Sequence, residues 1–419
     1  MGRHLEKMVA AGLLSLALLT SLTGCLQTAQ TTPSSQPSQG ETTSQVEHAI
    51  PPEENRMFSV PNISWYSSRD GKGFYLPGSR LLSYYDPESQ SEIPLCAQSG
   101  CSHSDESCGA YLADDVQGFV TYQGHWYVLA VEGSDQAVLW KIDPQTHQRT
   151  KLCCISPQHN QEAYYFSSGF VSHGYAYLHL NHQLIWEEQV VEEPSLIRVN
   201  LTDGTVETLV EDVYVSFLGA GEDQVLLAVE TFAVPPLSQE EYLKQHPDGN
   251  YYAYLQVQLA ENGSGGMELR AYTPDMSSYQ VLTKGNVWVS STPFLTRYGD
   301  HTLYAVDNTL YVYDLATGER REVVNEGILR NFMMIAGQII YLTRSQGSSA
   351  LAISYTDLAG GPAHRLANEG VEDGTVFSFS GECKDYIYGL YNGEHGDCQA
   401  LLTKEDYFAQ RYENIIPIS

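Results

Sequence analysis

The stretch LYVYDLATGERREVV, from Leu310 to Val324, carries the signals of a β-hairpin in fifteen consecutive residues. Apolar and aromatic residues alternate before Asp314, as in a strand with one buried face, and two valines end the return strand. Gly318 closes the turn between them, where a glycine takes a positive φ without steric cost. A hairpin of this size is not stable alone, so it predicts neighbouring copies stacked against it.

The same strand-turn-strand phrase recurs along the chain. Its turn residues are 41 or 42 residues apart in the C-terminal half and 57 apart in the N-terminal half. A second hairpin precedes each copy, formed by a short apolar strand, a polar or glycine turn and an aromatic strand. Copies of the phrase begin at Leu82, Leu139, Leu196, Leu269, Leu310 and Ile353, and a degenerate copy runs from Val376 to Ile416.

Two hairpins per copy predict a four-stranded unit, and four-stranded units with a period in the low forties are typical of β-propellers. We therefore predict an all-β fold, a β-propeller of about seven four-stranded blades, with six or eight blades also compatible with the spacing. An array of β-sandwich domains is the alternative, because it too consists of short strands joined by turns.

The N-terminal region has the pattern of an export signal followed by a tether. Residues 1–24 have a basic start and an apolar run, Met8 to Leu22, that is shorter than the ~20 residues of a bilayer-spanning helix. Residues 25–56 are filled with Gln, Thr, Ser and Pro, and we expect a disordered tether with a reach of roughly 30 Å. Residues 57–419 then form the propeller domain.

The signal ends in Leu22-Thr23-Gly24-Cys25, which resembles the lipobox of bacterial lipoproteins: an aliphatic residue, two small residues and a cysteine. The resemblance implies that Cys25 becomes the first residue of the mature chain and carries the lipid anchor, a diacylglyceryl thioether with palmitate. It places the protein on the extracytoplasmic side of the cell membrane. The alternative is an ordinary signal peptide that happens to end in cysteine.

The turn phrase Tyr311-Val-Tyr-Asp-Leu-Ala-Thr-Gly318 resembles those of YWTD-type and TolB-type propellers. Residues 57–419 as a whole are similar to Firmicute surface lipoproteins with such a propeller, most of them without an assigned activity. The resemblance implies a fold rather than a function.

Acidic residues outnumber basic ones by 51 to 22, which gives a net charge of −29. Because nucleic acids and anionic lipid surfaces repel such a chain, we expect no nucleic-acid partner, and membrane contact only through the lipid anchor.

Four long segments depart from the base period. If the strands of each blade are lettered a to d from the inside outwards, the a–b and c–d turns lie on one face, and the b–c loops and blade-to-blade crossings lie on the other. All four long segments fall on this second face: 96–117, 154–168, 182–194 and 231–267. We expect it to bind an envelope protein or a carbohydrate, with aromatic candidates Tyr164, Tyr165, Trp186, Tyr242 and Tyr251.

The longest of these segments predicts an insertion in blade four. Ser238 with Glu241 three residues later forms a capping box, and Pro247 ends the helix after two turns. Because the residue types in 251–259 alternate as they do in a strand, we predict a small helix followed by a hairpin.

The first long segment contains Cys96, Cys101, His103 and Cys108, spaced C-x4-C-x-H-x4-C. This set can hold zinc, although the spacing is not that of a standard zinc finger. Exported proteins also permit disulfides, so three interpretations stay open: a disulfide, a metal site or free thiols. A similar cluster occurs in the Firmicute propeller lipoproteins.

Signals of an enzyme are weak. The sequence has no G-x-S-x-G, no H-E-x-x-H and no P-loop, and with 51 acidic residues no carboxylate pair stands out. We expect His125, His179 and His182 to be solvated strand residues rather than bases or ligands. We therefore favour a ligand- or protein-binding module over a propeller enzyme acting on polysaccharide, such as a glycosidase or lyase, or an envelope assembly factor.

Overall fold

The fold is taken from a computed structural model of the chain. The structure describes residues 53, 56–58, 66–68, 71–77, 80–96, 98–105, 107–112, 115–159, 162–186, 189–210, 215–247, 249–289, 296–345, 347, 351–366, 377–393 and 396–418. All of them belong to one unit, Val46–Ser419. The predicted signal, the predicted lipid-anchor residue Cys25 and nearly all of the predicted tether lie outside these residues. No helix in the described ranges is long and apolar enough to span a bilayer.

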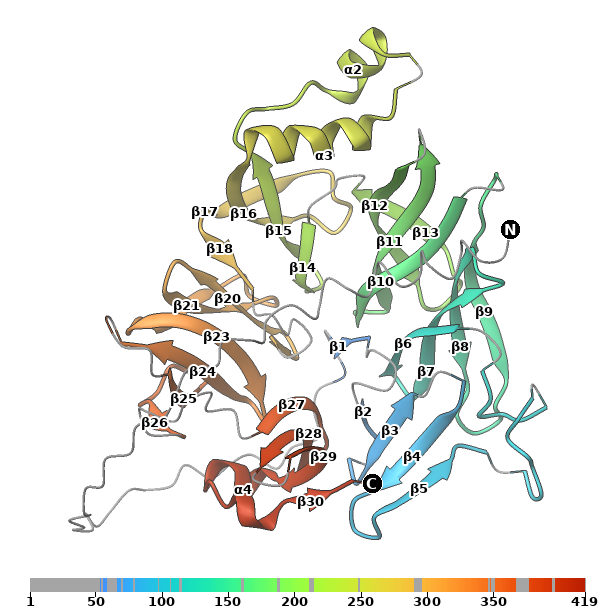
Figure 1. Ribbon diagram of the computed structural model, residues 1–419, viewed down its shortest axis with the longest axis vertical. Coiled ribbons are helices and arrows are strands. Elements are labelled where there is room, and N and C mark those ends of the chain that lie inside the picture. Colours follow the sequence, from blue (N-terminus) through green and yellow to red (C-terminus); the bar gives the residue numbers. More distant parts are fainter. Residues whose placement is uncertain are drawn as a thin grey trace. The chain divides into compact units, whose positions relative to one another are not determined.

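Seven antiparallel sheets follow one another along the described chain, each built on four strands in sequence order, to which two of the sheets add a fifth strand (Figure 1). Blades one to three consist of β2 (Tyr66–Ser67), β3 (Phe74–Pro77), β4 (Leu82–Asp86) and β5 (Ser91–Pro94); β6 (Asp115–Tyr122), β7 (His125–Glu132), β8 (Gln136–Ile142) and β9 (Arg149–Ile155); and β10 (Glu162–Ser172), β11 (Tyr175–Trp186), β12 (Gln189–Asn200) and β13 (Val206–Val210).

Blades four to seven complete the ring. They consist of β14 (Val215–Ala220), β15 (Val225–Phe232), β16 (Ser264–Tyr272) and β17 (Tyr279–Gly285); β18 (Val287–Trp288) with β19 (Arg297–Tyr298), β20 (His301–Val306), β21 (Thr309–Asp314) and β22 (Arg320–Val324); β23 (Ile328–Ile335), β24 (Gln338–Arg344), β25 (Leu351–Asp357) and β26 (His364–Arg365); and β27 (Phe377–Glu382), β28 (Tyr386–Gly393), β29 (Gly396–Thr403) and β30 (Ile416–Pro417). The predicted seven-bladed β-propeller is confirmed.

The organising hairpin forms as predicted. Its strands are β21 and β22, and the Asp314 carboxylate accepts hydrogen bonds from the backbone amides of Ala316 and Thr317. Gly318 has a φ of 73°, the left-handed conformation that the turn requires. In other blades Asp86, Asp143 and Asn200 likewise accept from the amide two residues later, whereas Asp357 accepts from the Gly361 amide.

The core lies between blades. Each pair of neighbouring blades shares one apolar cluster, such as Leu303 and Val312 of blade five against Phe332 and Tyr341 of blade six. The cluster between blades one and seven, with Phe74 against Cys383 and Tyr388, closes the ring. An array of separate sandwiches would bury its sheets in pairs, whereas this ring of interfaces is that of a propeller.

We call the face with the a–b and c–d turns the turn face, and the opposite face, with the b–c loops and blade-to-blade crossings, the crossing face. Two of the predicted long segments on the crossing face are mostly strand. β10 begins at Glu162, and β11 and β12 continue pairing until Trp186 faces Gln189. The reason is that His182 and Gln183 pair across the sheet with Glu193 and Glu192, which favours an extended hairpin over a loop.

The insertion in blade four lies between β15 and β16 and projects beyond the rim of the ring (Figure 1). Its first helix, α2 (Gln239–Gln245), begins with the predicted capping box of Ser238 and Glu241. The predicted hairpin is wrong, because residues 251–262 form a second helix, α3 (Tyr251–Asn262). The Asn250 side chain caps α3 by accepting from the Ala253 amide, and Leu, Gln and Ala are good helix formers.

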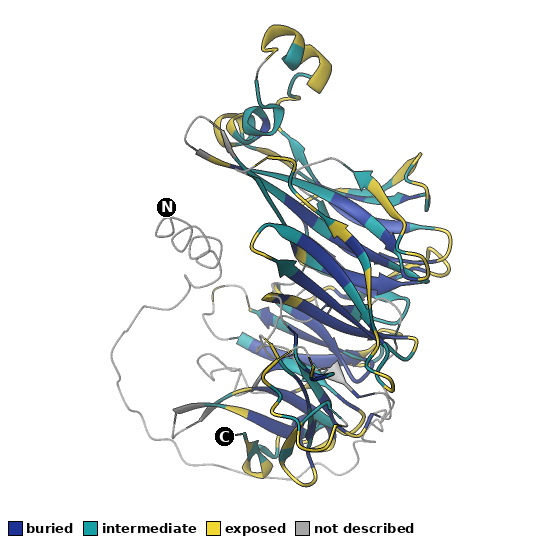
Figure 2. Cartoon of the chain, turned by 90° about the vertical axis from the view of Figure 1, so that its right-hand side faces the viewer, coloured by how far each residue is buried: buried dark blue, intermediate teal, exposed yellow. Residues whose placement is uncertain are grey.

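Three elements of the described chain were not predicted. A short strand, β1 (Arg56–Met57), pairs with the inner edge of β10 as a fifth strand of blade three. The helices α4 (Lys404–Phe408) and η3 (Tyr412–Asn414) connect β29 to β30. Figure 2 shows that the buried residues follow the strands and that exposure concentrates in the insertion and the turns.

Candidate functional site

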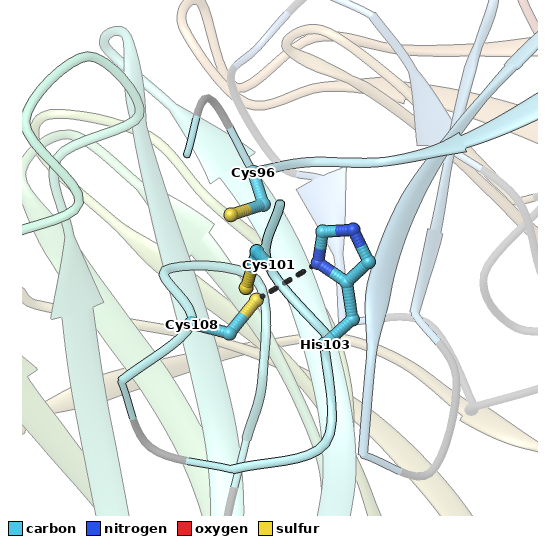
Figure 3. Close-up of side chains that lie close together, drawn as sticks. All are labelled: Cys96, Cys101, His103 and Cys108. Atoms are coloured by element: carbon cyan, nitrogen blue, oxygen red, sulfur yellow. Dashed lines mark hydrogen bonds between the residues drawn. The ribbon is translucent and has the colours of Figure 1, made fainter. Parts of the chain in front are cut away.

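The predicted cysteine and histidine cluster is assembled in the structure (Figure 3). Cys96 follows β5, and Cys101, His103 and Cys108 lie in the crossing from β5 to β6. Their four ligand atoms all lie within 4.8 Å of one another, and His103 Nδ1 is 3.3 Å from Cys108 Sγ. The thiols are free in the structure. Three thiols and one imidazole at this spacing can bind a metal ion.

Local turns bring these side chains together. Gly100 and His103 both have left-handed φ angles, 74° and 55°, which reverse the chain between the first and last cysteine. Asp105 accepts hydrogen bonds from the Ser107 amide and hydroxyl, and its carbonyl accepts from the Cys108 amide. The backbone therefore presents all four side chains to one point.

Blade two contacts the C-terminal end of the crossing from β5 to β6, which carries the cysteine and histidine cluster. Arg149 Nη2 donates to the carbonyl oxygens of Cys108, Gly109 and Tyr111. A Cβ on Gly109 would lie 2.5 Å from the His147 ring, so only glycine fits between the loop and the turn before β9. The crossing thus lies along the flank of blade two, whereas the other long segments extend near blades three and four (Figure 1).

The thiols of the cluster differ in their environments. Burial raises the pKa of Cys108 to about 11. The pKa of Cys96 is lowered, chiefly by a hydrogen bond from the Gln98 backbone. A cavity of about 640 Å³ lies beside the cluster, lined by Cys96, Cys108, Leu112, Val128, Trp140 and His147 among others.

A second group of functional side chains lies at the crossing-face end of blade three. Tyr164 stacks on His182 with the ring centroids 4.4 Å apart and the planes at 9°. His182 Nδ1 is 2.9 Å from Glu193 Oε2, and its Nε2 is 3.7 Å from Glu162 Oε2. Burial and the charges of Glu162 and Glu193 raise the pKa of Tyr164. The histidine is therefore enclosed by two carboxylates and a ring, and the prediction that it is solvated is wrong.

The neighbouring tyrosine takes part in the same network. Tyr165 Oη donates to Glu192 Oε1 over 3.0 Å, and Gln183 Nε2 donates to the same oxygen over 2.8 Å. Burial, followed by the charge of Glu192, raises the pKa of Tyr165. We call Glu162, Tyr164, Tyr165, His182, Glu192 and Glu193 the blade-three cluster.

The insertion is joined to this cluster through Asn250, whose Nδ2 donates to Glu193 Oε1 over 2.7 Å. Tyr242 and Tyr251 pack mainly within the insertion itself. The Tyr242 ring stacks on Tyr254 at 4.6 Å, and Tyr251 Oη donates to the Leu237 carbonyl. These two candidates hold α2 against α3 and are half-buried. Trp186 ends β11, and its side chain lies outside what is described.

His179 also departs from the expectation of a solvated residue. Its ring lies edge-to-face against Phe217, 5.2 Å between centroids. Burial, helped by the charge of Arg297, lowers the pKa of His179 to about 4. His125 is nearer to the expectation, since its Nδ1 is 3.1 Å from the Gln123 carbonyl oxygen in an exposed turn.

Sequence reasoning missed two features. Glu162, His182 and Glu193 come from three different strands, and only the strand register brings them together. Arg297 is buried and donates to the carbonyl oxygens of Phe217 and Leu218, with no carboxylate partner among the described residues. Its place on β19, at the inner edge of β20, was the signal that the sequence offered.

Together these features define a seven-bladed β-propeller with a cysteine–histidine cluster on its flank and an acidic, aromatic cluster at blade three. No protein-family model matches the sequence, and no curated protein matches it. Solved structures do match. An oligogalacturonate lyase from Vibrio parahaemolyticus is 11% identical, with 87% of this chain and 96% of the lyase covered and a TM-score of 0.48.

Two further solved structures are similar to this chain. The β-propeller domain of the Trilobed protease from Pyrococcus furiosus is 11% identical, with 75% of this chain and 85% of that domain covered and a TM-score of 0.39. TolB from Acinetobacter baumannii is 10% identical, with 85% and 63% covered and a TM-score of 0.31. At these values the comparisons assign no activity to this chain.

Proposed function

We propose that this chain is a lipid-anchored, extracytoplasmic propeller that binds a basic segment of another envelope protein at the blade-three cluster. The observation that carries the proposal is the pair of contacts on Glu193, whose two oxygens meet His182 of blade three and Asn250 of the insertion. The cluster is thereby a built arrangement of carboxylates and rings rather than a chance group of surface charges.

The chemistry of the cluster suits a cationic side chain. Glu162, Glu192 and Glu193 supply three carboxylates beside Tyr164 and Tyr165, and rings beside carboxylates attract both lysine and arginine. The net charge of −29 adds long-range attraction for a basic partner. A neutral sugar stacked on the rings is the competing ligand, and it would lack the dependence on salt.

Binding is tested with a lysine- and arginine-rich peptide as the probe. Glu192→Gln with Glu193→Gln should weaken binding at least tenfold and flatten its dependence on salt, because both changes remove charge at the site. Glu319→Gln with Glu322→Gln is the matched control, since both residues are exposed on blade five and the net charge changes equally. Equal losses in the two double variants would show unspecific attraction and overturn the proposed site.

The insertion gives a second test of the same function. Replacing residues 235–262 by a short turn should abolish peptide binding but move the thermal transition only slightly, because Leu255 is the one buried residue of α3 and α2 has none. Unfolding of the shortened protein would show that the insertion belongs to the core. A propeller that folds and binds as before would exclude the insertion from the site.

Anchoring rests on the resemblance of residues 22–25 to a lipobox. Cys25→Ala should leave a soluble or uncleaved precursor, because the thioether carries the lipid. A variant that still partitions with membranes as a processed chain would contradict this interpretation.

We also propose that the cysteine and histidine cluster holds a structural zinc ion. The ligands of a tetrahedral zinc site lie ~3.7 Å from one another, and a separation of at most 4.8 Å needs only a small contraction. Cys96, Cys101, His103 and Cys108 would then close all four positions, so the ion would fix the crossing rather than catalyse a reaction.

The purified protein should contain one zinc per chain by elemental analysis. The thiols of the 96–108 peptide should alkylate after chelation alone, whereas a disulfide would require a reductant first. Cys108→Ser should lose the metal, and Cys154→Ser is the control, because Cys154 is an exposed thiol of β9 outside the cluster. A bond found between two cluster cysteines would replace the zinc interpretation with a disulfide.

A further inference from the structure

The N-terminal strand β1 is seated at the centre of the propeller. Arg56 and Met57 pair with Val171 and Phe170 on the inner edge of β10, and the Phe58 amide donates to the Gly169 carbonyl. Met57 is buried in the core between blades three and four, and Phe58 in the core between blades two and three. Figure 1 shows β1 inside the ring of blades. The segment is therefore part of the fold rather than a loose end.

Groups from blades two and five form hydrogen bonds with the same segment. Arg56 Nη1 donates to Thr121 Oγ1 of β6 over 2.7 Å, and Glu53 Oε2 accepts from the Gln123 amide over 2.8 Å. Arg297 of β19 donates to Met57 Sδ and to two carbonyl oxygens of β14. Innermost strands of blades two to five thus surround the described residues 53 and 56–58 at the channel.

The register gives the direction in which the chain enters. β10 runs towards its a–b turn at residues 173–174, and β1 is antiparallel to it, so β1 runs away from the turn face. Glu53 contacts Gln123, which lies in the a–b turn between β6 and β7. Both observations place the N-terminal end of the described segment at the turn face.

The blade-three cluster and the insertion lie at the other side. The insertion leaves the sheet at the b–c connection of blade four, and His182 and Glu193 lie towards the b–c connection of blade three. The chain therefore enters the propeller at one face and carries its functional side chains at the opposite one.

We propose that the channel-seated segment orients the anchored propeller, with its turn face towards the bilayer and the blade-three cluster directed away from it. This inference rests on the proposed lipid anchor at Cys25. The partner of the blade-three cluster is then a basic segment of a protein that approaches from outside. Lipid headgroups of the same membrane are too far away to bind there.

The length of the tether supports this orientation. As the tether that their composition predicts, residues 26–52 would have a root-mean-square reach of roughly 26–31 Å. A domain of this size has a radius of gyration of about 21 Å, so the path from the channel mouth round the rim to the other face exceeds ~50 Å. The tether would have to stretch to nearly twice its usual span to turn the crossing face to the membrane.

The orientation is tested by energy transfer on vesicles. The lipidated protein is reconstituted in phosphatidylcholine vesicles that carry an acceptor dye on the headgroup. A fluorescent amino acid is placed at Ala316, in the turn-face hairpin of blade five, or at Ala260, in α3; both positions are exposed. Transfer should be at least twofold stronger from 316 than from 260. Equal transfer, or stronger transfer from 260, overturns the proposal.

A second preparation tests the orientation independently of the proposed lipid anchor. A chain that begins at residue 26 and carries a dialkyl group coupled to its N-terminus gives the same comparison without the lipobox. If the native protein fails to bind vesicles but the coupled chain shows the bias, the anchor is wrong and the orientation stands. The Phe58 amide should also exchange slowly with solvent in either form, and exchange at the rate of a free amide would show that β1 is not seated.

Discussion

Asn250 contacts Glu193 across 57 residues of sequence, and this hydrogen bond of 2.7 Å joins the helical insertion to β12 of blade three. The same side chain caps α3, because Asn250 Oδ1 accepts from the Ala253 amide over 2.8 Å. One residue therefore both begins the helix and docks it, and the two roles use different atoms of the amide group.

These two roles can be separated by substitution. Asn250→Asp keeps the cap, since a carboxylate is an equally good N-cap, but places a second carboxylate against Glu193. Asn250→Ala removes both and should destabilise α3 by about 2 kcal/mol. Hydrogen exchange should show a folded but undocked α3 in the Asp variant and a frayed α3 in the Ala variant. Identical exchange in both variants would contradict the docking role.

The close contact between Gly109 and His147 gives a second prediction. Gly109→Ala places a Cβ 2.5 Å from His147 Cγ, and this overpacking should cost about 1–3 kcal/mol in unfolding by denaturant. His147→Gly should rescue the variant, since it removes the ring and suits the φ of 58° at that position.

Gly100→Ala is the matched control for this pair. Its φ of 74° makes a side chain unfavourable, but no atom of the described residues lies within 4 Å of its Cβ position, so His147→Gly should not rescue it. Rescue of both glycine variants, or of neither, would show that the contact between Gly109 and His147 does not determine the conformation of the crossing.

The sequence predicted the blades well because each hairpin encodes its own turn. Asp314 and Gly318 determine a turn within five residues, and the repetition of that turn reveals the ring. The cysteine cluster was also predictable, because all four ligands lie within one loop.

Contacts between distant strands could not be predicted in this way. His182 meets Glu162 and Glu193 only through the register of three strands, and Arg297 meets Met57 only through closure of the ring. The second helix was missed because residues 251–259 alternate like a strand, while the cap at Asn250 and the helix propensity of Leu, Gln and Ala decide the outcome.

His179 predicts a loss of stability in acid. Its pKa is lowered from its usual 6.5 to about 4, mainly by burial against Phe217 and also by the charge of Arg297. The unfolded chain therefore binds a proton between pH 6.5 and 4 that the folded chain does not bind, so stability falls as the pH is lowered through this window. Between pH 7.5 and 4.5 the loss from this residue should be about 2–3 kcal/mol.

Urea unfolding at the two pH values measures this loss. His179→Gln removes the titrating group, so the variant should lose about 2–3 kcal/mol less than the wild type between pH 7.5 and 4.5. The comparison isolates His179, because all other titrating groups are the same in the two proteins. Nuclear magnetic resonance of the His179 ring provides the direct check. Protonation of the ring near pH 6.5, or equal losses in the two proteins, would contradict burial of this histidine between blades three and four.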